Sequence, residues 1–263
     1  TSAILTIAAS LSASKSPFQS SFLGNDSQMK AAHASFSHPH SDFLTLTNVW
    51  DAFERADVKG ETRKFCREKF LNYAAMLEIR DSRLHFYDLL CDLGFVDRIG
   101  PDALGDTSRN SDNEAVVHAV VCAGIYPNVA RVTKSSGDEV NVEHKNEKLF
   151  IRSSVNSKLS FPLPSHWLIY FEKFGTEQRV TISTTAFVSP FCIMLFGSQV
   201  EVMHTERKVK VDEWIQLSIK EKTGVIFKEF CNRLDELLAA VIEGVASPDA
   251  SFRDGKSERV IDC

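Results

Sequence analysis

Residues 123–132 read AGIYPNVARV, and the pattern of the chain changes within this stretch. Gly124 and Asn128 tolerate unusual backbone angles and Pro127 fixes its own φ, so the first half predicts a turn. The alternation of apolar and polar residues that follows, from Val129 to Lys134, predicts a half-buried strand with one wet face. A β region is therefore expected to begin near residue 128.

Upstream of this turn the sequence predicts helices. In residues 42–53 the apolar side chains recur at intervals of three and four, and Asp42 is the expected N-cap. Gly60 breaks the pattern, and a later helix is expected to end at Gly94. Residues 97–114 are rich in Asp, Asn, Ser and Gly, which is typical of a linker or an exposed loop.

Downstream of the turn, short strand-like segments follow one another. They cover residues 128–134, 140–143, 148–152, 167–174 and 178–185, and strands resume at 199–204 and 207–216. A short helix interrupts them, with Ser189 as N-cap, Pro190 in its first turn and Gly197 at its end. Five short strands with one internal helix are the pattern of a small Greek-key barrel, the OB-fold.

The predicted fold class is therefore α+β, with an N-terminal helical bundle, a small OB-fold β-barrel and a C-terminal helix. The expected boundaries are 1–112 for the helical domain, 113–222 for the barrel, and 223–263 for the last helix and a mobile tail. This last helix is expected from about residue 225 to Gly244. The chain starts at Thr1 inside an expected helix, which indicates a piece of a longer protein.

Composition excludes several classes of protein. The net charge of −5 gives no sign of a dedicated polyanion binder, although residues 1–110 carry 12 Lys+Arg against 14 Asp+Glu and residues 115–225 carry 13 against 11. No apolar run approaches the length of about 20 residues that spans a bilayer, so no membrane association is expected. The six cysteines form no CxxC pair, which favours a reduced intracellular protein, cytoplasmic or nuclear.

Motifs for catalysis or metal binding are weak. Gly255-Lys256-Ser257 lacks the second glycine of a P-loop, because the position five residues earlier holds Ala250. His33, His38 and His40 surround Pro39 in an expected loop and are better explained as exposed loop histidines than as a metal site. A hydrolase built from scattered Cys and His residues has no supporting spacing. We expect no catalytic residue, cofactor or metal in this chain.

Binding is the function that remains. OB-folds hold single-stranded nucleic acid with stacked bases and with cations near phosphates. The candidate RNA-binding residues are the hairpin lysines Lys145 and Lys148, the strand-end residues Arg152, Ser153, Ser154 and Asn156, and Lys173. The alternative for the hairpin is a solvated turn kept polar. Trp167, Tyr170, Phe171 and Phe174 also invite a stacking interpretation, but core packing is favoured for most of them.

Several blocks carry a family resemblance. In order, they are LTIAASLSASKSPF (5–18), HSDFLTLTNVWDAF (40–53), FCREKFLNYAAMLEIRDSRLHFYDLL (65–90), AGIYPNVARV (123–132), IRSSVN (151–156), HWLIYFEKF (166–174), FVSPFCIMLFGS (187–198) and VDEWIQL (211–217). Together they resemble the C-terminal accessory region of the DExH-box (DEAH/RHA) ATP-dependent RNA helicases, most closely the RNA helicase A-like branch. The resemblance covers roughly residues 1–243.

The resemblance implies a ratchet-like helicase-associated domain followed by an OB-fold, both packed on two RecA-like motor domains of the same parent chain. It implies that the region helps to enclose single-stranded or structured RNA, while ATP and Mg belong to the parent motor. One departure is Ile151-Arg152, where the family often has His-Pro before the paired serines. No motor motif can be assigned in this chain, so the fragment itself is expected to be non-catalytic.

A rival interpretation is a protein-interaction platform. In that case the barrel and helices dock on the motor and recruit activator proteins, with little RNA contact. The acidic net charge of −5 is compatible with this alternative.

Overall fold

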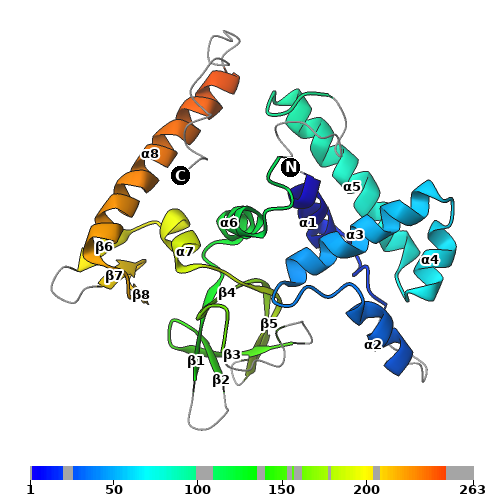
Figure 1. Cartoon of the computed structure of the whole chain (residues 1–263), viewed down its shortest axis with the longest axis horizontal. Helices are drawn as coiled ribbons and strands as arrows, with labels where there is room; N and C mark the ends of the chain where they lie inside the picture. Colours follow the sequence, from blue (N-terminus) through cyan, green and yellow to red (C-terminus); the bar gives the residue numbers. More distant parts are fainter. Residues whose placement is uncertain are drawn as a thin grey trace.

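The computed structural model describes residues 2–19, 26–98, 109–134, 140–152, 156, 162–176, 179–203 and 208–246. The predicted α+β class is confirmed: a group of helices lies beside a closed five-stranded barrel, and a long helix follows a second, small sheet (Figure 1). The helices before the barrel are α1 (Ser2–Ser12), α2 (Asp26–Ala34), α3 (Asp42–Val58), α4 (Thr62–Glu68), α5 (Tyr73–Asp92) and α6 (Glu114–Ile125).

The helical region is built around α3 and α5. Its core consists of apolar side chains from several helices: Ala9, Phe36, Val49, Trp50, Ala52, Phe53, Cys66, Leu71, Met76 and Ile79. Ser41 is the N-cap of α3, and its side chain accepts a hydrogen bond from Leu44 N. The sequence-based choice of Asp42 as cap was therefore one residue off, because Asp42 accepts hydrogen bonds from the barrel residue Thr185. Gly94, with φ of 77°, follows the end of α5 as predicted.

The AGIYPNVARV stretch forms the expected turn into a strand. Helix α6 ends at Ile125, the Tyr126 backbone N–H donates to Cys122 O, and β1 begins at Val129. The Tyr126 hydroxyl donates to Asp212, which lies in the later small sheet region. Burial is the largest reason that the pKa of Tyr126 is raised well above its usual range, and the hydrogen bond to Asp212 adds to it.

The barrel closes in the strand order β1-β2-β3-β5-β4. Its strands are β1 (Val129–Lys134), β2 (Val140–His144), β3 (Glu147–Ile151), β4 (Trp167–Thr176) and β5 (Arg179–Phe187). Strands β3 and β5 pair in parallel, and the other pairs are antiparallel. The interior is filled by Ala130, Val132, Val142, Leu149, Leu168, Tyr170, Ile182 and Phe187. The OB-like pattern predicted from the five segments is confirmed.

The segments after the barrel differ in detail from the prediction. Helix α7 (Pro190–Phe196) has Ser189 as N-cap and Pro in its first turn, as expected. The expected strand over 207–216 is split into β7 (Lys208–Val211) and β8 (Ile215–Leu217), because Asp212 and Glu213 both have positive φ. These strands form a separate sheet with β6 (Val200–Met203). Helix α8 (Glu221–Ala246) runs two residues beyond the expected stop at Gly244.

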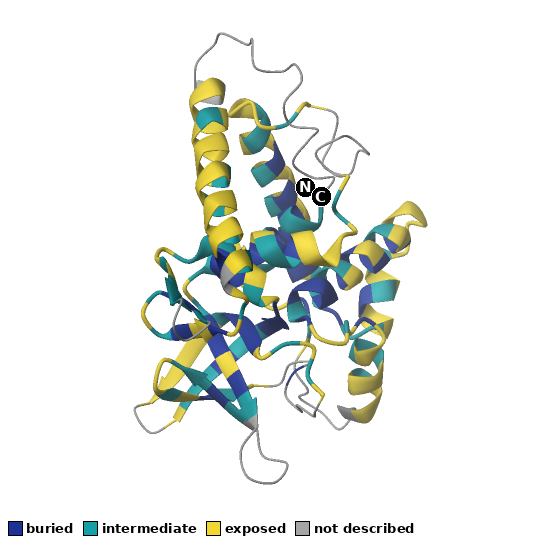
Figure 2. Cartoon of the chain, turned by 60° about the vertical axis from the view of Figure 1, so that its left-hand side comes forward, coloured by how far each residue is buried: buried dark blue, intermediate teal, exposed yellow. Residues whose placement is uncertain are grey.

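One hydrophobic core joins the two regions. Ile7, Phe43 and Leu44 of the helices pack in the same cluster as barrel residues Val129 and Ile169. The buried residues accordingly run without a break from the helices to the barrel, whereas α8 is exposed along most of its length (Figure 2). The domain boundaries at residues 112 and 222 stay predictions. The helical region and the barrel share one hydrophobic core across the first of them.

Candidate nucleic-acid interface

An outward-facing row of side chains crosses β3, β5 and β4. In the strand register Phe150 is the partner of Thr181, and Thr181 is also the partner of Phe174. Because paired residues project from the same side of a sheet, the two phenylalanine rings share one surface with Thr181 between them. Phe174 is 38% exposed, which is unusual for a phenylalanine. This row offers two aromatic rings on the outside of the barrel.

Three cations accompany the rings. The guanidinium carbon of Arg179 lies 4.8 Å from the centroid of the Phe150 ring, and that of Arg152 lies 5.4 Å from the Phe174 ring. Lys148 Nζ lies 5.7 Å from the Phe150 ring. All three cations are exposed, and none forms an ion pair with a residue that the structure describes. We call the set Lys148, Phe150, Arg152, Phe174 and Arg179 the aromatic–basic platform.

The platform has the side-chain composition of surfaces that bind single-stranded nucleic acid. Guanidinium planes and aromatic rings both stack on nucleobases, and the unpaired cations can contact phosphates. The backbone beneath it is held in place, since Arg152 N donates to Ile182 O at 2.9 Å. Four of the five platform residues thus lie on paired strands, and Arg152, which follows β3, is hydrogen-bonded to β5.

The other predicted residues lie in different surroundings. Lys145 is exposed in the turn between β2 and β3, with φ of 56°. Lys173 forms an ion pair with Glu147 and projects from the side of the sheet opposite Phe174. Ser153 and Ser154 lie outside the described residues. Among the predicted residues that the structure describes, Lys148 lies beside the half-buried ring of Phe150 and Arg152 lies beside the exposed ring of Phe174.

Asn156 is buried, with 2% of its surface exposed. Its side-chain amide donates to Thr185 Oγ1 at 3.0 Å and to His40 O at 3.3 Å. These contacts join the barrel to the loop that precedes α3. Asn156 therefore holds the two regions together in this structure, and we do not include it in the platform.

Sequence reasoning did not select Phe150 or Arg179. The signal for Phe150 was the alternation Lys148, Phe150 and Arg152, which places the three side chains on one face of β3. Arg179 could not be found in this way, because its approach to Phe150 depends on the parallel pairing of β3 with β5.

The remaining aromatic residues of β4 pack inward, as favoured from the sequence. Trp167 and Tyr170 are 5% and 2% exposed, and Phe171 packs against the core shared with the helices. Burial, and secondarily the charge of Glu147, raises the pKa of Tyr170. Phe174 differs because the end of the β4–β5 hairpin extends past the core, as its burial pattern indicates.

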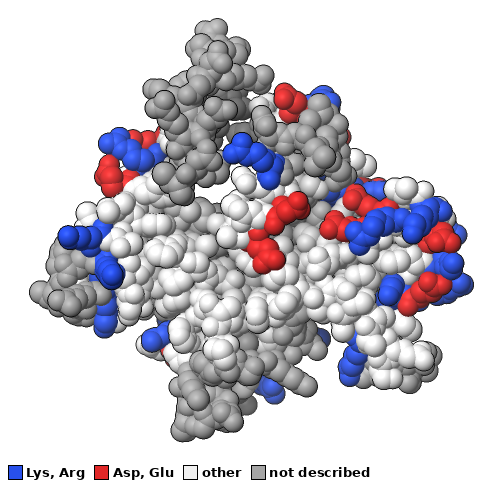
Figure 3. Space-filling view, in the orientation of Figure 1, with Lys and Arg blue, Asp and Glu red and all other residues white. Residues whose placement is uncertain are grey.

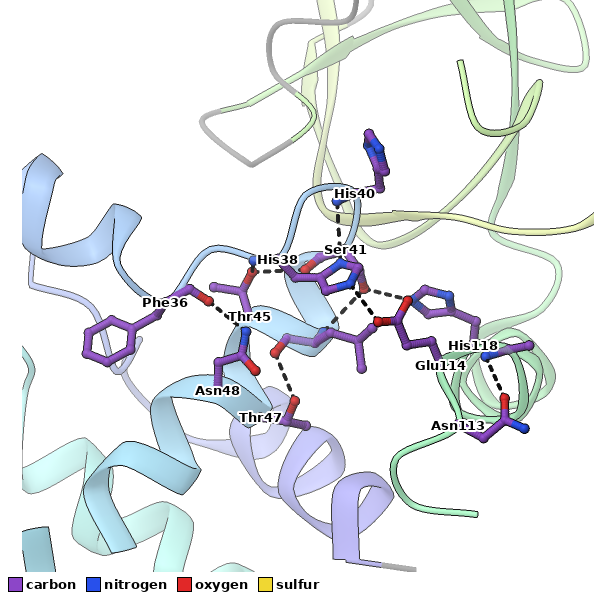
Figure 4. A network of polar contacts seen from close by, with 12 residues as sticks. Phe36, His38, His40, Ser41, Thr45, Thr47, Asn48, Asn113, Glu114 and His118 are labelled. Atoms are coloured by element: carbon purple, nitrogen blue, oxygen red, sulfur yellow. Dashed lines mark hydrogen bonds and ion pairs between the residues drawn. The ribbon is translucent and has the colours of Figure 1, made fainter. Parts of the chain in front are cut away.

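The junction between α3 and α6 holds a polar network (Figure 4). His118 Nε2 lies 2.9 Å from Ser41 Oγ, and His38 Nε2 lies 3.2 Å from Glu114 Oε1. Burial, and then the neighbouring His38, lowers the pKa of His118, while Glu114 partly offsets this. Within the described ranges, no group of three His, Cys, Asp or Glu side chains is placed to hold a metal ion.

The histidines of the expected loop serve separate contacts. His33 lies in the last turn of α2 and donates to Phe70 O at 3.0 Å, so it does not belong to a loop. The Gly255-Lys256-Ser257 segment lies outside the described residues. None of the described helices is both long enough and apolar enough to span a membrane.

Comparison with known proteins agrees with the barrel assignment. Residues 117–200 match the family described as "Oligonucleotide/oligosaccharide-binding (OB)-fold". The chain is 32% identical over 264 residues to the Homo sapiens ATP-dependent DNA/RNA helicase DHX36, with 97% of this chain and 26% of that protein aligned. It is 30% identical over 280 residues to the chloroplastic DExH-box ATP-dependent RNA helicase DExH4 of Arabidopsis thaliana, with 92% and 20% aligned.

A third relative is the Mus musculus ATP-dependent RNA helicase DHX29, 30% identical over 274 residues, with 98% of this chain and 19% of that protein aligned. The chain thus spans about a fifth to a quarter of the length of these relatives. A helical region followed by an OB barrel, the match to the OB-fold family and the alignment along almost the whole chain converge on one assignment. The chain belongs to the DExH-box helicases and corresponds to their C-terminal accessory region.

Proposed function

We propose that this chain is a non-catalytic RNA-binding and regulatory part of an ATP-dependent helicase, and that the aromatic–basic platform contacts single-stranded RNA. The observation that supports this most directly is that two aromatic rings on one sheet surface lie beside three exposed cations, which form no ion pair with a described residue. The match to an oligonucleotide-binding family adds support. The motor domains of the parent protein would bind ATP and Mg. The parent protein would be intracellular.

The energetics predict a weak and salt-sensitive grip. Each stacked base contributes about 1–3 kcal/mol. Three phosphate contacts, one each at Lys148, Arg152 and Arg179, predict a slope of roughly −2 for the logarithm of the binding constant against the logarithm of salt concentration. Weak binding per nucleotide suits a part of a translocating enzyme, which must release the strand at every step.

The test is fluorescence anisotropy of the chain with a labelled single-stranded RNA, from low to physiological salt, with single-stranded DNA of the same sequence alongside. Phe174→Ala removes a ring and Arg152→Gln removes a cation, and each is expected to weaken binding about tenfold. The matched control is Lys59→Gln, because Lys59 is an exposed cation at the end of α3, far from the barrel in sequence. Equal affinity of all three variants and the unaltered chain would refute the platform.

A second candidate function is docking of proteins, and helix α8 favours it. Helix α8 carries several exposed apolar residues: Val225, Ile226, Phe230, Leu237, Leu238, Val241 and Ile242. Exposed apolar side chains that gather on one helix indicate contact with another protein surface, such as the motor or an activator. Replacing Leu237, Leu238 and Val241 with Ser should abolish binding to a separately produced motor while RNA affinity stays unchanged.

A further inference from the structure

A cavity of about 520 Å³ lies beside the barrel and has no platform residue in its lining. Its walls come from β1, the start of β4, the first residue of α7 and the segment from β8 to Ile219. Its polar or aromatic lining residues include Arg131, Thr133, His166, Trp167, Gln216 and Ser218. This volume is within the range of about 300–1,000 Å³ that is usual for small-molecule sites.

The charge of the cavity favours an anion. None of the described residues that line it is acidic, and Arg131 is exposed and makes no ion pair with a described residue. Lys208 Nζ donates to Gln216 Oε1 at 3.3 Å, and this contact holds the Gln216 side chain. Arginine forms planar, paired hydrogen bonds with phosphate oxygens, so Arg131 is the expected phosphate contact.

His166 offers a flat surface in the same cavity. Its Nδ1 donates to Val132 O at 3.2 Å, and this contact orients the exposed ring. Histidine rings stack on unpaired bases in RNA-binding proteins. The hydroxyls of Thr133 and Ser218 are suited to sugar oxygens, and the Gln216 amide can donate to a base edge.

The strand register connects the cavity with the platform. Lys148 is the partner of Glu143, and Glu143 is the partner of Arg131, so the three side chains form one row on the outside of β3, β2 and β1. Adjacent strands lie about 4.8 Å apart, which puts Arg131 roughly 10 Å from Lys148 along the barrel. Because Glu143 lies between them, phosphates are expected at Lys148 and Arg131 and not above Glu143.

We propose that this cavity binds a single nucleotide of a single-stranded nucleic acid, with its phosphate at Arg131 and its base on the His166 ring. The inference rests on the proposed function, since the strand that reaches the cavity is the one that crosses the platform. It adds a separate subsite with its own residues, at β1, β4 and β8, which neither the sequence motifs nor the family match assigns.

The first test uses adenosine 5′-monophosphate as the probe and nuclear magnetic resonance of the whole chain as the readout. The Trp167 indole and His166 ring signals should shift on titration, while the Trp50 indole signal, in the helical core, should stay unchanged. Arg131→Gln should weaken binding about tenfold through loss of a charged hydrogen bond. Ser218→Trp should fill the cavity and remove the shifts, and Lys59→Gln should leave them intact.

The outcomes separate the subsite from other ligands. Equal shifts and equal affinity with inorganic phosphate would reduce the cavity to an anion site and overturn the nucleotide assignment. Stronger shifts with a short poly-glutamate peptide would reassign it to acidic protein segments. No shift with any probe, in a chain whose Trp50 signal shows that it is folded, would also refute the proposal.

A second experiment distinguishes failure of the subsite from failure of the proposed function. A single-stranded oligoribonucleotide is titrated into the chain, and both anisotropy and the Trp167 signal are followed. If the RNA binds and Phe174→Ala weakens it, but Trp167 never shifts, the platform stands and the subsite is wrong. If the RNA does not bind at low salt, both proposals fail. If both signals respond, and Arg131→Gln weakens binding about tenfold, both are supported.

Discussion

Two cavities of this molecule differ sharply in charge. The cavity of about 400 Å³ between α1, α3 and α6 is lined by four carboxylates, those of Asp51, Glu54, Asp112 and Glu114. The cavity beside the barrel has Arg131 and His166 and no carboxylate among its described lining residues. A net charge of −5 therefore conceals two opposite local environments. An anionic ligand is therefore expected to favour the cavity beside the barrel over the helical cavity.

Charged side chains on one face of the molecule also differ between the helical region and the platform. Lys, Arg, Asp and Glu side chains gather together over the helices at the right of Figure 3, where neighbouring charges of opposite sign offset one another. Lys64 with Glu61 in the helical region is one such pair. The platform cations lack carboxylate partners among the described residues, so their charge remains available to a ligand.

The largest expected effect concerns the core that the two regions share. Phe43 is fully buried in the joint cluster, and Phe53 is buried in the helical cluster alone. Either change to Ala should reduce the free energy of unfolding by about 3–5 kcal/mol. Hydrogen exchange with mass spectrometry should show Phe43→Ala lowering protection in α3 and in β4 together. Loss confined to α3 would mean that the regions are separate units.

The role of the platform cations is tested by removing their charge. Changing Lys148, Arg152 and Arg179 together to Gln should weaken single-stranded RNA binding about 100-fold at low salt, because three charged contacts are lost. The matched control changes Lys59, Arg63 and Lys64 of the helical region and should leave affinity within about twofold. Anisotropy titrations at several salt concentrations supply the measurement. An equal loss in both triple variants would remove the distinction between the two regions.

Asn156 tests whether a contact between the two regions affects stability or RNA binding. It belongs to the barrel region, and its side-chain amide donates to His40 O of the helical region. Asn156→Ala leaves polar groups around Thr185 without its amide, and should cost about 1–3 kcal/mol of unfolding free energy. RNA affinity of the folded variant should be unchanged. Urea unfolding and anisotropy measure the two quantities. A selective loss of RNA affinity at full stability would return Asn156 to the binding surface.

The smallest expected effect is the pH dependence of the helical junction. Burial and His38 hold the pKa of His118 below its ordinary value of 6.5, so the unfolded chain takes up this proton at a higher pH than the folded chain does. Stability should therefore fall as the pH is lowered from about 6.5. His118→Gln should flatten this part of the profile in urea unfolding between pH 7 and pH 5. A profile identical to that of the unaltered chain would show that His118 contributes nothing.

Local patterns were sufficient to predict most elements. Ser189, Pro190 and Gly197 mark a short helix because capping and φ restrictions act within a few residues, and α7 lies where they indicate. The same holds for the turn at Pro127 and for Gly94. The split of 207–216 was not predicted, because positive φ at Asp212 and Glu213 gives no strong sequence signal. The helix α2 was also missed, since its nine residues carry few apolar side chains.

The candidate site was less accessible from the sequence. Alternation along β3 places Lys148, Phe150 and Arg152 on one face, and family resemblance indicates a barrel that binds nucleic acid. The approach of Arg179 to Phe150, and the row from Lys148 through Glu143 to Arg131, require the pairing of strands that lie far apart in the chain. Asn156 was predicted as an exposed RNA contact but is buried between the barrel and the helical region. A polar residue near a strand end is consistent with either position, so the sequence could not distinguish them.

Short-range periodicity, capping and ordered motifs were sufficient to predict most helices and strands, the OB-like barrel and the relation to a helicase family. The three-dimensional structure was needed to identify which cations lack a carboxylate partner among the described residues and which ring of β4 reaches solvent. It was also needed to find a cavity whose described lining residues include no carboxylate. The physical reason is that burial and charge pairing are properties of side chains brought together by long-range strand pairing and packing, and a local pattern carries no information about such neighbours.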